Sequence, residues 1–533
     1  MARIVSHVRR PMNSTSRFGA RMRAALAGVC AALGISGCSS PAPKPAPVAK
    51  ATALPVLRRQ DMLWLERVTF GIDGESVAEL HHLGRARYLD HQLEGGDSLP
   101  APVAAEIDAL EVEHLDPVRT LADVNAQYKT INAMPDSPEK EAARKSMNER
   151  AGKLAYEAIR GELLRATYSP AQLEEQMVWF WLNHFSVHQY KANLRWLVAD
   201  YADHAIRPHA LGHFKDLVLA TLEHPAMLQY LDNSQNAAGH INENYARELM
   251  ELHTLGVNSG YTQEDVQQLA RILTGSGINF GNPPKLKPEW QRLYRREGAF
   301  EFNPARHDFG DKVFLGKHIA GSGFAEVDAA VDLIVRQPAC GRFIARQIAM
   351  YFVADNPPPQ LVERMAQVFS RTDGDIAAVL KEMFLSPEMD AALGGKFKDP
   401  MRFVISAVRF AYDGRTITNT RPMFNWLNGL GEMPFGRQTP DGYPLTEVSW
   451  ASSGQMSRRL EIARAIGSGN AGLFDAEEGA AASATGFPQL SNRLYFEAVE
   501  PFLAARTRAA LSKASSQQEW NTFLLASPDF NYE

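Results

Sequence analysis

Apolar residues recur at intervals of three and four along most of the chain, which is the spacing of one face of an α-helix. This pattern predicts helices over 58–70, 75–93, 152–167, 171–187, 211–222, 243–255, 263–274, 325–336, 341–353, 359–371, 375–385, 399–412, 455–466 and 490–510. Strict alternation of apolar and polar residues, which marks a half-buried strand, is scarce. The sequence therefore predicts an all-α fold with a large multi-helix body.

One segment departs from the helical pattern. Between 298 and 319, the pairs Phe300/Phe302 and Val313/Leu315 flank a turn-rich loop. Short apolar runs on either side of such a loop are typical of a β-hairpin. We expect one small hairpin there.

The helical pattern covers residues 57–533, which we take as the body of the protein. Within it, the stretch 116–150 is polar and charged, which predicts an exposed helical excursion. A loose division of the body is expected near 290–320. The body is long enough to bury one large core or two coupled cores.

The stretch 240–277 predicts a helical hairpin that is unusually rich in functional groups. Asn242 is a good N-cap for the first helix, and Gly256 ends it. Thr262 and Asp265 form a capping box for the second helix, which Gly275 ends. At the α-helical repeat, Tyr245, Leu249 and Leu252 form the buried stripe of the first helix, with Ala246 and Met250 at its edge.

The first 37 residues resemble a bacterial lipoprotein signal peptide. Six arginines and no acidic residue precede a short apolar run, which ends at Ile35-Ser36-Gly37-Cys38. The resemblance implies cleavage before Cys38 and acylation of that cysteine, and Ser39 favours the periplasmic side of the outer membrane. The alternative is an ordinary secretory signal with a chance cysteine. Residues 38–56 continue as the acylated cysteine and a Pro/Ala tether, extended at about 3 Å per residue.

Charge and cysteine content narrow the class of protein. Once the arginines of the signal are set aside, the 61 acidic residues outnumber the basic ones by about eleven, which argues against nucleic acid and anionic lipid as partners. Of three cysteines, two lie in the signal and only Cys340 remains. No intramolecular disulfide is therefore expected in the body, and Cys340 is interpreted as a small buried residue.

Several long motifs, in order, resemble one known family. They are WFWLNHF at 179–185, HPAMLQYLDN at 224–233, NENYARELMELHTLGV from 242, HDFGDKVFLG at 307–316 and GDIAAVLKEMFLSPE at 374–388. Together they resemble the bacterial domain-of-unknown-function family numbered 1800, over about residues 57–530. The resemblance implies an exported, largely helical protein that often neighbours a family with a sulfatase-like fold, numbered 1501. It implies no established activity.

Histidines are concentrated in one part of the chain, where eight of fifteen lie between His184 and His253. His184 and His188 are four apart, which on a helix places both rings on one face, as a metal pair needs. Glu248 and Glu251 are three apart and are also helical neighbours. The predicted metal ligands are His184, His188, Glu248, Glu251 and His307, a set that suits Zn, Mn or Fe. Glu248, Glu251 and Arg247 are the catalytic candidates.

A structural interpretation of the same residues stays open. His184 fits a hydrogen-bonded histidine on an aromatic helix, and Glu243, Arg247 and Glu251 fit a ladder of ion pairs, each worth a few tenths of a kcal/mol. The sequence also lacks the Glu-x-x-His pairs of di-iron bundles and the H-E-x-x-H motif. No complete ligand set follows from spacing alone.

Two loops carry further polar and aromatic side chains. The amide-rich loop after Asp232-Asn233 is expected to satisfy backbone groups in turns, and alternatively to line a polar pocket. The loop 434–450 carries Phe435, Tyr443 and Trp450, for which we expect core packing with one exposed edge.

Two functional hypotheses follow. The first is an envelope lipoprotein that acts as an accessory or binding protein, with a secreted partner or an envelope polymer; a sulfatase-like protein is one candidate partner, by resemblance only. The second is a metal-dependent hydrolase with a His/Glu site between helices, in which the cation activates water.

Overall fold

Prolines and short polar side chains mark where the helices begin. In the computed structural model, which describes residues 57–96, 98–475 and 487–533, many helices start on a proline at their first position, where its missing N–H costs nothing. The predicted capping box is confirmed, since Thr262 and Asp265 exchange hydrogen bonds between side chain and backbone N–H. The sequence thus encodes helix starts locally.

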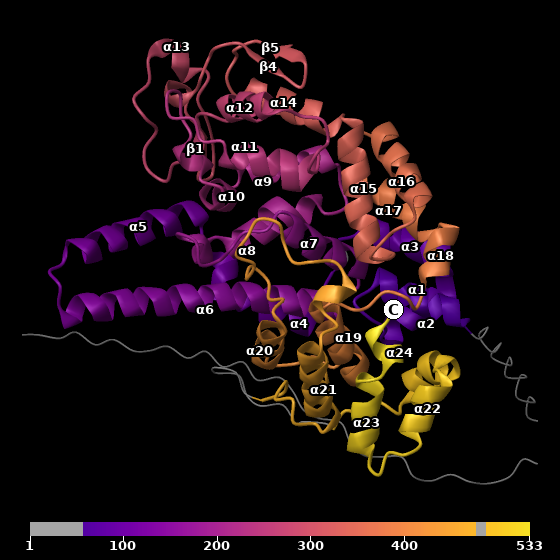
Figure 1. Cartoon of the computed structure of the whole chain (residues 1–533). Helices are drawn as coiled ribbons and strands as arrows, with labels where there is room; N and C mark the ends of the chain where they lie inside the picture. Colours follow the sequence, from indigo (N-terminus) through magenta and orange to yellow (C-terminus); the bar gives the residue numbers. More distant parts are fainter. Residues whose placement is uncertain (1–56, 97, 476–486) are drawn as a thin grey trace, which may run out of the picture. The chain divides into compact units, whose positions relative to one another are not determined.

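Helices account for most of the described residues and strands for few, which confirms the all-α prediction (Figure 1). The first elements after residue 57 are α1 (Arg59–Val68), α2 (Gly74–Leu83), α3 (Arg85–Glu94), α4 (Ala101–Asp108) and the 3-10 helix η1 (Glu111–His114).

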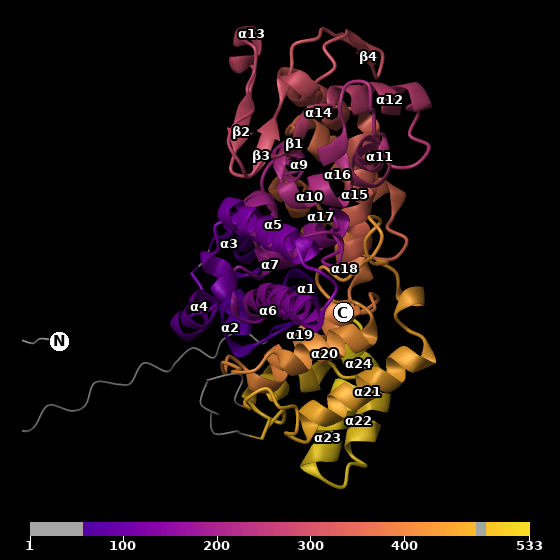
Figure 2. The ribbon, with the colours of Figure 1, turned by 90° about the vertical axis from the view of Figure 1, so that its left-hand side faces the viewer.

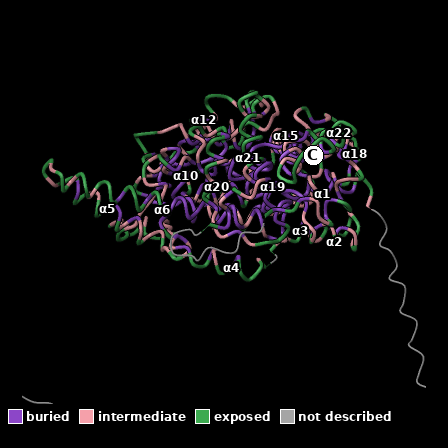
Figure 3. Tube along the Cα trace, turned by 90° about the horizontal axis from the view of Figure 1, so that it is seen from below, coloured by how far each residue is buried: buried purple, intermediate pink, exposed green. Residues whose placement is uncertain are grey.

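The predicted helical excursion is present as two long helices, α5 (Pro117–Ala133) and α6 (Pro138–Tyr168). They run together and extend away from the other helices (Figures 1 and 3). Side chains of α6 become consistently buried only beyond Ala151. The outer half of this hairpin is therefore largely exposed.

The middle of the chain is built from short helices, several of them not α-helical. They are α7 (Gln172–His184), η2 (Leu194–Trp196), α8 (Val198–Asp200), η3 (Tyr201–Ile206), η4 (Arg207–His209), α9 (Phe214–Glu223), α10 (Pro225–Tyr230), η5 (Asn233–Gln235), α11 (Asn244–Glu248), η6 (Leu249–Thr254) and α12 (Gln263–Ile272). Elements η3 and η6 are π-helices. Such helices are rare, and they often occur at functional sites.

Two small antiparallel sheets replace the single expected hairpin. The first has the order β1-β3-β2, formed by Ser276–Ile278, Phe300–Phe302 and Arg295–Glu297 (Figure 2). The second pairs β4 (Lys312–Phe314) with β5 (Lys317–Ile319). The two apolar runs do not pair with each other, because each finds a nearer partner across a shorter turn.

The rest of the chain returns to helices. They are α13 (Pro288–Gln291), η7 (Pro304–Arg306), α14 (Ala325–Val335), α15 (Pro338–Phe352), α16 (Pro359–Arg371), α17 (Ile376–Phe384), α18 (Pro387–Ala392), α19 (Pro400–Tyr412), α20 (Arg421–Leu430), η8 (Glu447–Ser449), α21 (Ser453–Gly467), η9 (Tyr495–Val499), η10 (Glu500–Phe502), α22 (Ala505–Leu511), α23 (Gln517–Leu525) and α24 (Pro528–Asn531). The single helix predicted over 490–510 is wrong. Pro501 cannot continue an α-helix, and the segment breaks into η9, η10 and α22.

The described residues from Leu57 onward form one compact unit, and a finer division near 290–320 stays a prediction. Its buried side chains form one apolar core, in which Cys340 is a free, buried thiol as expected. None of the described helices has both the length and the apolar character needed to cross a bilayer. The predicted signal peptide, Cys38 and the tether lie outside the described residues.

Candidate functional site

His184 and His253 form a reciprocal pair that joins α7 to η6. The His184 Nε2–H donates to the carbonyl oxygen of His253 (2.9 Å), and the His253 Nδ1–H donates to the carbonyl oxygen of His184 (2.8 Å). The ring centroids are 5.8 Å apart. Each ring thus satisfies a backbone group of the other segment at a helix end.

Both rings of this pair are held neutral. Burial lowers the pKa of His184 to about 4, and burial, together with the neighbouring His184, lowers the pKa of His253 to about 3. His253 is 0% exposed, and its Nε2 finds no hydrogen-bond partner among the described residues. With its Nε2 committed to a carbonyl, His184 acts as a structural histidine in this geometry.

The first helix of the predicted hairpin is α-helical only as far as Glu248. From Leu249 it continues as the π-helix η6, in which Leu255 N–H bonds to Met250 O (2.9 Å). His253 is buried, as the helical repeat predicts from its position toward the apolar side, whereas Leu252, expected in the buried stripe, is only partly buried. Gly256 ends the segment at a φ of +84°, as predicted. Asn242 Oδ1 accepts from Asn244 N–H (2.9 Å). The expected capping bond is therefore present, although Glu243, one residue later, occupies the N-cap position of α11.

Glu248 and Glu251 lie half-buried on the same segment. No hydrogen bond or ion pair joins either carboxylate to another side chain in the described part of the chain. Burial, reinforced by the charges of Glu251 and Asp441, raises the pKa of Glu248 against the opposing charge of Arg247. These carboxylates are available to a ligand, or to acid–base chemistry, because no protein group uses them.

Arg247 belongs to a different set of contacts. Its guanidinium donates to Glu243 Oε2 (3.0 Å) and to Gln263 Oε1 (3.0 Å), and Gln263 in turn donates to Glu243 (2.7 Å). These bonds tie α11 to α12. The expected ladder is thus half formed, since Arg247 pairs with Glu243 and not with Glu251.

His188 does not share a helical face with His184, because α7 ends at His184 and His188 lies in the following turn. Burial lowers the pKa of His188, and its buried Nδ1 has no hydrogen-bond partner among the described residues. Asp441 of the loop 434–450 adds to the rise in the pKa of Glu248, after burial and the charge of Glu251. Glu248 and Glu251 share one continuous segment, whereas His188 lies on another, after the end of α7.

The loop 434–450 is fixed to the end of α7. Asn183 accepts from Tyr443 N–H (2.6 Å) and donates to Tyr443 O (3.1 Å). A Cβ on Gly442, whose φ is +72°, would lie 2.3 Å from Asn183 O, so only glycine fits this contact. Phe435 and Trp450 are buried and Tyr443 is partly buried, which confirms core packing with one exposed edge.

The amide-rich loop serves the backbone, as expected for turn residues. Asn233 Nδ2 donates to Leu273 O and Ser276 O, and Asn236 Nδ2 donates to Ala270 O (2.8 Å). These bonds hold the loop against the end of α12.

His307 lies in a separate, buried network. Its Nε2 bonds to Glu326 Oε1 (2.9 Å) and its Nδ1 bonds to Thr274 O (2.8 Å), while Lys312 contacts the other oxygen of Glu326. The side chains of His307, Lys312 and Glu326 are 0% exposed. No hydrogen bond or ion pair in the described ranges joins His307 to the other four predicted ligands. His307 is therefore committed elsewhere and does not cover the Glu248 neighbourhood.

Over residues 57–96, 98–475 and 487–533, no group of three or more His, Cys, Asp or Glu side chains is arranged to hold a metal ion. Of the five predicted ligands, Glu248 and Glu251 share one segment, His184 is engaged in the histidine pair, and His307 is bound to Glu326. Metal binding by these residues therefore stays a prediction.

Sequence reasoning missed a charged cleft beside the π-helix η3. The cleft has a volume of about 340 Å³ and is lined by Val112, Glu113, Leu115, Pro117, Arg165, Trp196, Ala199, Asp200, Asp203, His204 and Arg207. Asp200 and His204, and likewise Asp203 and Arg207, stand four apart, a helical spacing that was readable in the sequence. Glu113 and Arg165 reach the same place only through the tertiary fold.

Ion pairs in this cleft are unevenly distributed. Arg207 binds Glu162 (2.8 Å) and Glu175 (2.7 Å), which both lie behind the wall. Of the three carboxylates on the wall itself, Asp200 has short contacts to His204 (2.9 Å) and His224 (2.8 Å), and the other two have longer ones. Glu113 lies 3.3 Å from Arg165, and Asp203 lies 3.7 Å from Arg165 and 3.4 Å from Arg207.

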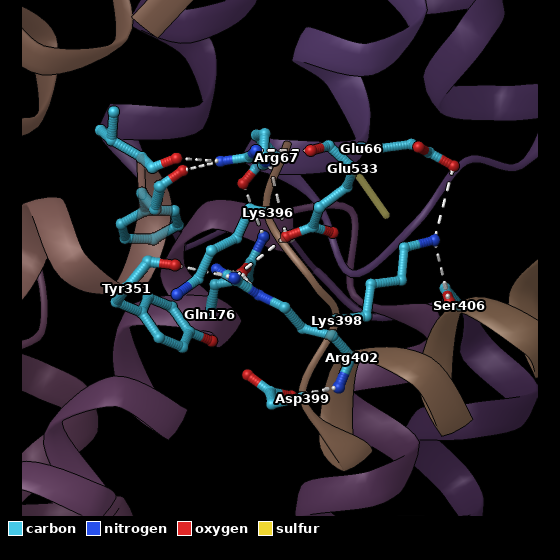
Figure 4. A network of polar contacts seen from close by, with 12 residues as sticks. Glu66, Arg67, Gln176, Tyr351, Lys396, Lys398, Asp399, Arg402, Ser406 and Glu533 are labelled. Atoms are coloured by element: carbon cyan, nitrogen blue, oxygen red, sulfur yellow. Dashed lines mark hydrogen bonds and ion pairs between the residues drawn. The ribbon is translucent and has the colours of Figure 1, made fainter. Parts of the chain in front are cut away.

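A further charged network is entirely internal (Figure 4). Arg402 of α19 donates to Gln176 Oε1 (2.9 Å) and Tyr351 O (2.8 Å), and its Nη1 lies 3.0 Å from Glu533 Oε1. Arg67 of α1 donates to the carbonyl oxygen of the same Glu533. Burial lowers the pKa of Arg67 to about 10. With both guanidiniums at most 1% exposed, this network joins segments of the core.

A comparison with known protein families gives the same family as the resemblance of the sequence motifs. A family described as "Protein of unknown function (DUF1800)" matches residues 63–532. The chain belongs to this family. Neither a curated protein nor a solved structure matches the chain significantly, so the DUF1800 membership brings no activity with it.

Proposed function

We propose that the protein is a ligand-binding accessory protein of the bacterial cell envelope, held by a lipid on Cys38 at the periplasmic side of the outer membrane. The cleft between η1, α6 and η3 supports this function most directly. Its volume of about 340 Å³ is within the range of ligand sites, about 300–1,000 Å³. Its wall combines charged donors and acceptors with apolar side chains, as ligand sites do.

Site-specific photocrosslinking in living cells tests the binding function. A benzoylphenylalanine replaces His204 at the rim of the cleft, where the side chain is 75% exposed. The control places the same group at His318, which is 63% exposed on β5 and outside the cleft. We expect a discrete crosslinked species from the His204 position only. Equal or absent crosslinking at the two positions contradicts the proposal.

The lipid anchor is tested separately. Feeding cells an alkyne fatty acid should label the wild-type protein, and Cys38→Ser should abolish the label and release the body from the membrane fraction. Label that persists in Cys38→Ser contradicts acylation at that residue. A sulfatase-like secreted protein remains one candidate partner, by resemblance only.

The second candidate function is hydrolysis, at Glu248 and Glu251. It is favoured by two neighbouring carboxylates that no protein group uses, one of them with a raised pKa. A divalent cation there would rest on these two groups and on His188, because His184 and His307 are engaged. Elemental analysis of purified protein should then find about one metal per chain, which Glu248→Gln releases. A metal-free protein without hydrolase activity rejects this candidate.

A further inference from the structure

Lys398 and Glu66 face each other inside the protein without a short bond between them. The Lys398 Nζ lies 3.6 Å from Glu66 Oε1 and 3.4 Å from Ser406 Oγ (Figure 4). Charge-assisted hydrogen bonds are usually about 2.7–2.9 Å long, and the nearby Lys396 reaches Asp355 at 2.6 Å. Because the Lys398 side chain is 0% exposed, its amine must find its partners within the protein. The amine therefore lies against the carboxyl group without a strong ion pair.

The surroundings of this pair favour its uncharged form. Burial raises the pKa of Glu66, although the charge of Lys398 opposes it. In the described ranges, no backbone N–H and no other side chain bonds to the Glu66 carboxyl group. Glu326 differs, because four donors hold it as a carboxylate. Transfer of one proton from the Lys398 Nζ to Glu66 leaves a neutral amine, which is a nucleophile, beside a neutral carboxyl group.

Both groups are carried by fixed backbone. The Lys398 N–H donates to Asn531 O (2.9 Å), and the Lys398 carbonyl oxygen accepts from the guanidinium of Arg459 (2.6 Å). Glu66 lies on α1, where the adjacent Arg67 is 0% exposed. Reacting groups held about 3–3.5 Å apart in a fixed geometry have already lost most of the freedom that their encounter would cost. The pair is therefore close to the arrangement from which an amine attacks a carboxyl carbon.

A cavity beside the pair can hold the water that such an attack releases. Its volume is about 30 Å³, which is enough for one water molecule. Glu66, Ser406, Phe530 and Asp529 are among the residues that line it. The first three are also neighbours of the Lys398 amine, and the ring centroid of Phe530 lies 4.4 Å from the Nζ. Asp529 supplies a second carboxylate that can accept a proton.

We propose that Lys398 and Glu66 are joined by an amide bond between the Lys398 Nζ and the Glu66 Cδ. The Nζ–Cδ bond forms, and the bond from Cδ to one carboxyl oxygen breaks. The two protons that the ammonium group loses leave with that oxygen as water, so no oxidant or other reactant takes part. The bond ties α1 to the segment before α19, in a body whose described part contains one free cysteine and no disulfide. It is independent of the proposed binding function.

Mass spectrometry of the purified, denatured full-length protein tests this bond. We expect the intact mass to be lower, by one water molecule, than the mass calculated for the same processed chain. A tryptic digest should contain a branched peptide in which residues 60–67 are joined to residues 397–402, because trypsin does not cleave after a lysine whose amine is acylated. A full intact mass, together with separate peptides from these two segments, would overturn the proposal.

Variants assign the bond to these two residues. Lys398→Met keeps most of the side-chain stem and removes the amine, and Glu66→Ala removes the carboxyl group, so each variant should lack the mass deficit and the branched peptide. Lys396→Met is the matched control, because Lys396 is buried two positions away but pairs with Asp355. The control should retain the deficit. A deficit that persists in Lys398→Met or in Glu66→Ala would overturn the assignment.

Discussion

His184 and His253 hold each other by crossed hydrogen bonds, in which each ring donates to the carbonyl oxygen of the other residue. Their presence in the histidine-rich region is thus explained by architecture. The pair closes the end of α7 against η6, and burial of both rings disfavours their protonation.

The histidine pair predicts acid sensitivity. Both pKa values lie below about 6.5, the value in an unfolded chain, so the unfolded state binds more protons below that pH. The free energy of unfolding therefore falls as pH drops from about 6.5 toward 4, by about 1.4 kcal/mol per pH unit for each histidine. In His253→Asn, whose amide can keep the donor and does not titrate, guanidinium unfolding between pH 7 and 5 should show a correspondingly smaller slope. His240→Ala, at an exposed position, should keep the wild-type slope; identical slopes in all three proteins contradict the prediction.

Replacing Glu248 should stabilise the protein slightly. The raised pKa means that ionised Glu248 costs stability above its unfolded value near pH 4.5, and this cost disappears once pH falls below that value. We expect Glu248→Gln to raise the free energy of unfolding by a few tenths of a kcal/mol at pH 7, and to have no effect at pH 4. The measurement is chemical unfolding at both pH values. A destabilised variant at pH 7 would mean that the carboxylate has a favourable partner, such as a bound cation.

The buried pair of Lys312 and Glu326 predicts a large loss from a single substitution. Burial acts to raise the pKa of Glu326, yet the bonds from His307, Lys312 and the backbone keep it below its ordinary value. Glu326→Gln leaves the Lys312 charge without a counter-ion and should cost about 3–5 kcal/mol. The double variant Lys312→Met with Glu326→Gln should recover much of this loss in thermal or chemical unfolding. If the double variant is as unstable as the single one, the charge pair is not the cause.

The contact between Gly442 and Asn183 predicts a local effect. Gly442→Ala forces a Cβ toward Asn183 O at a positive φ, which should cost about 1–3 kcal/mol and displace the loop 434–450. Because Tyr443 stacks on Trp179, tryptophan fluorescence of the folded variant should change. Gly429→Ala, where a Cβ meets nothing within 4 Å, is the control. Unaltered stability and fluorescence in Gly442→Ala would show that the loop is not held there.

The parts of the fold that were predicted correctly depend on neighbours in sequence. The Thr262–Asp265 capping box and the stop at Gly256 follow from residues at most a few positions apart. The π-helix after Glu248 was not predicted, and within it His253 bonds to His184, which lies 69 residues away in the sequence.

In the candidate site, too, residues that share one segment were predicted correctly, and contacts between distant segments were not. Glu248 and Glu251 were recognised because they share one segment, and the structure leaves both available. The metal grouping of His184 with His307 required two distant segments to meet, and each ring has a different partner instead. The cleft beside η3 was missed because Glu113, Arg165 and Asp203 lie on three elements that only the folded chain assembles.

Arg67 and Glu533 are 466 positions apart and nevertheless touch inside the core. Arg67 of α1 also bonds to Val353 O and Ala392 O, so the contacts of this helix join three distant parts of the chain. A ribosome or translocation channel would release most of this chain before its interior could close, and contacts of such high order are formed late and slowly. Loss of the Glu533 side chain would leave Arg67 and Arg402 without their shared carboxylate inside the core.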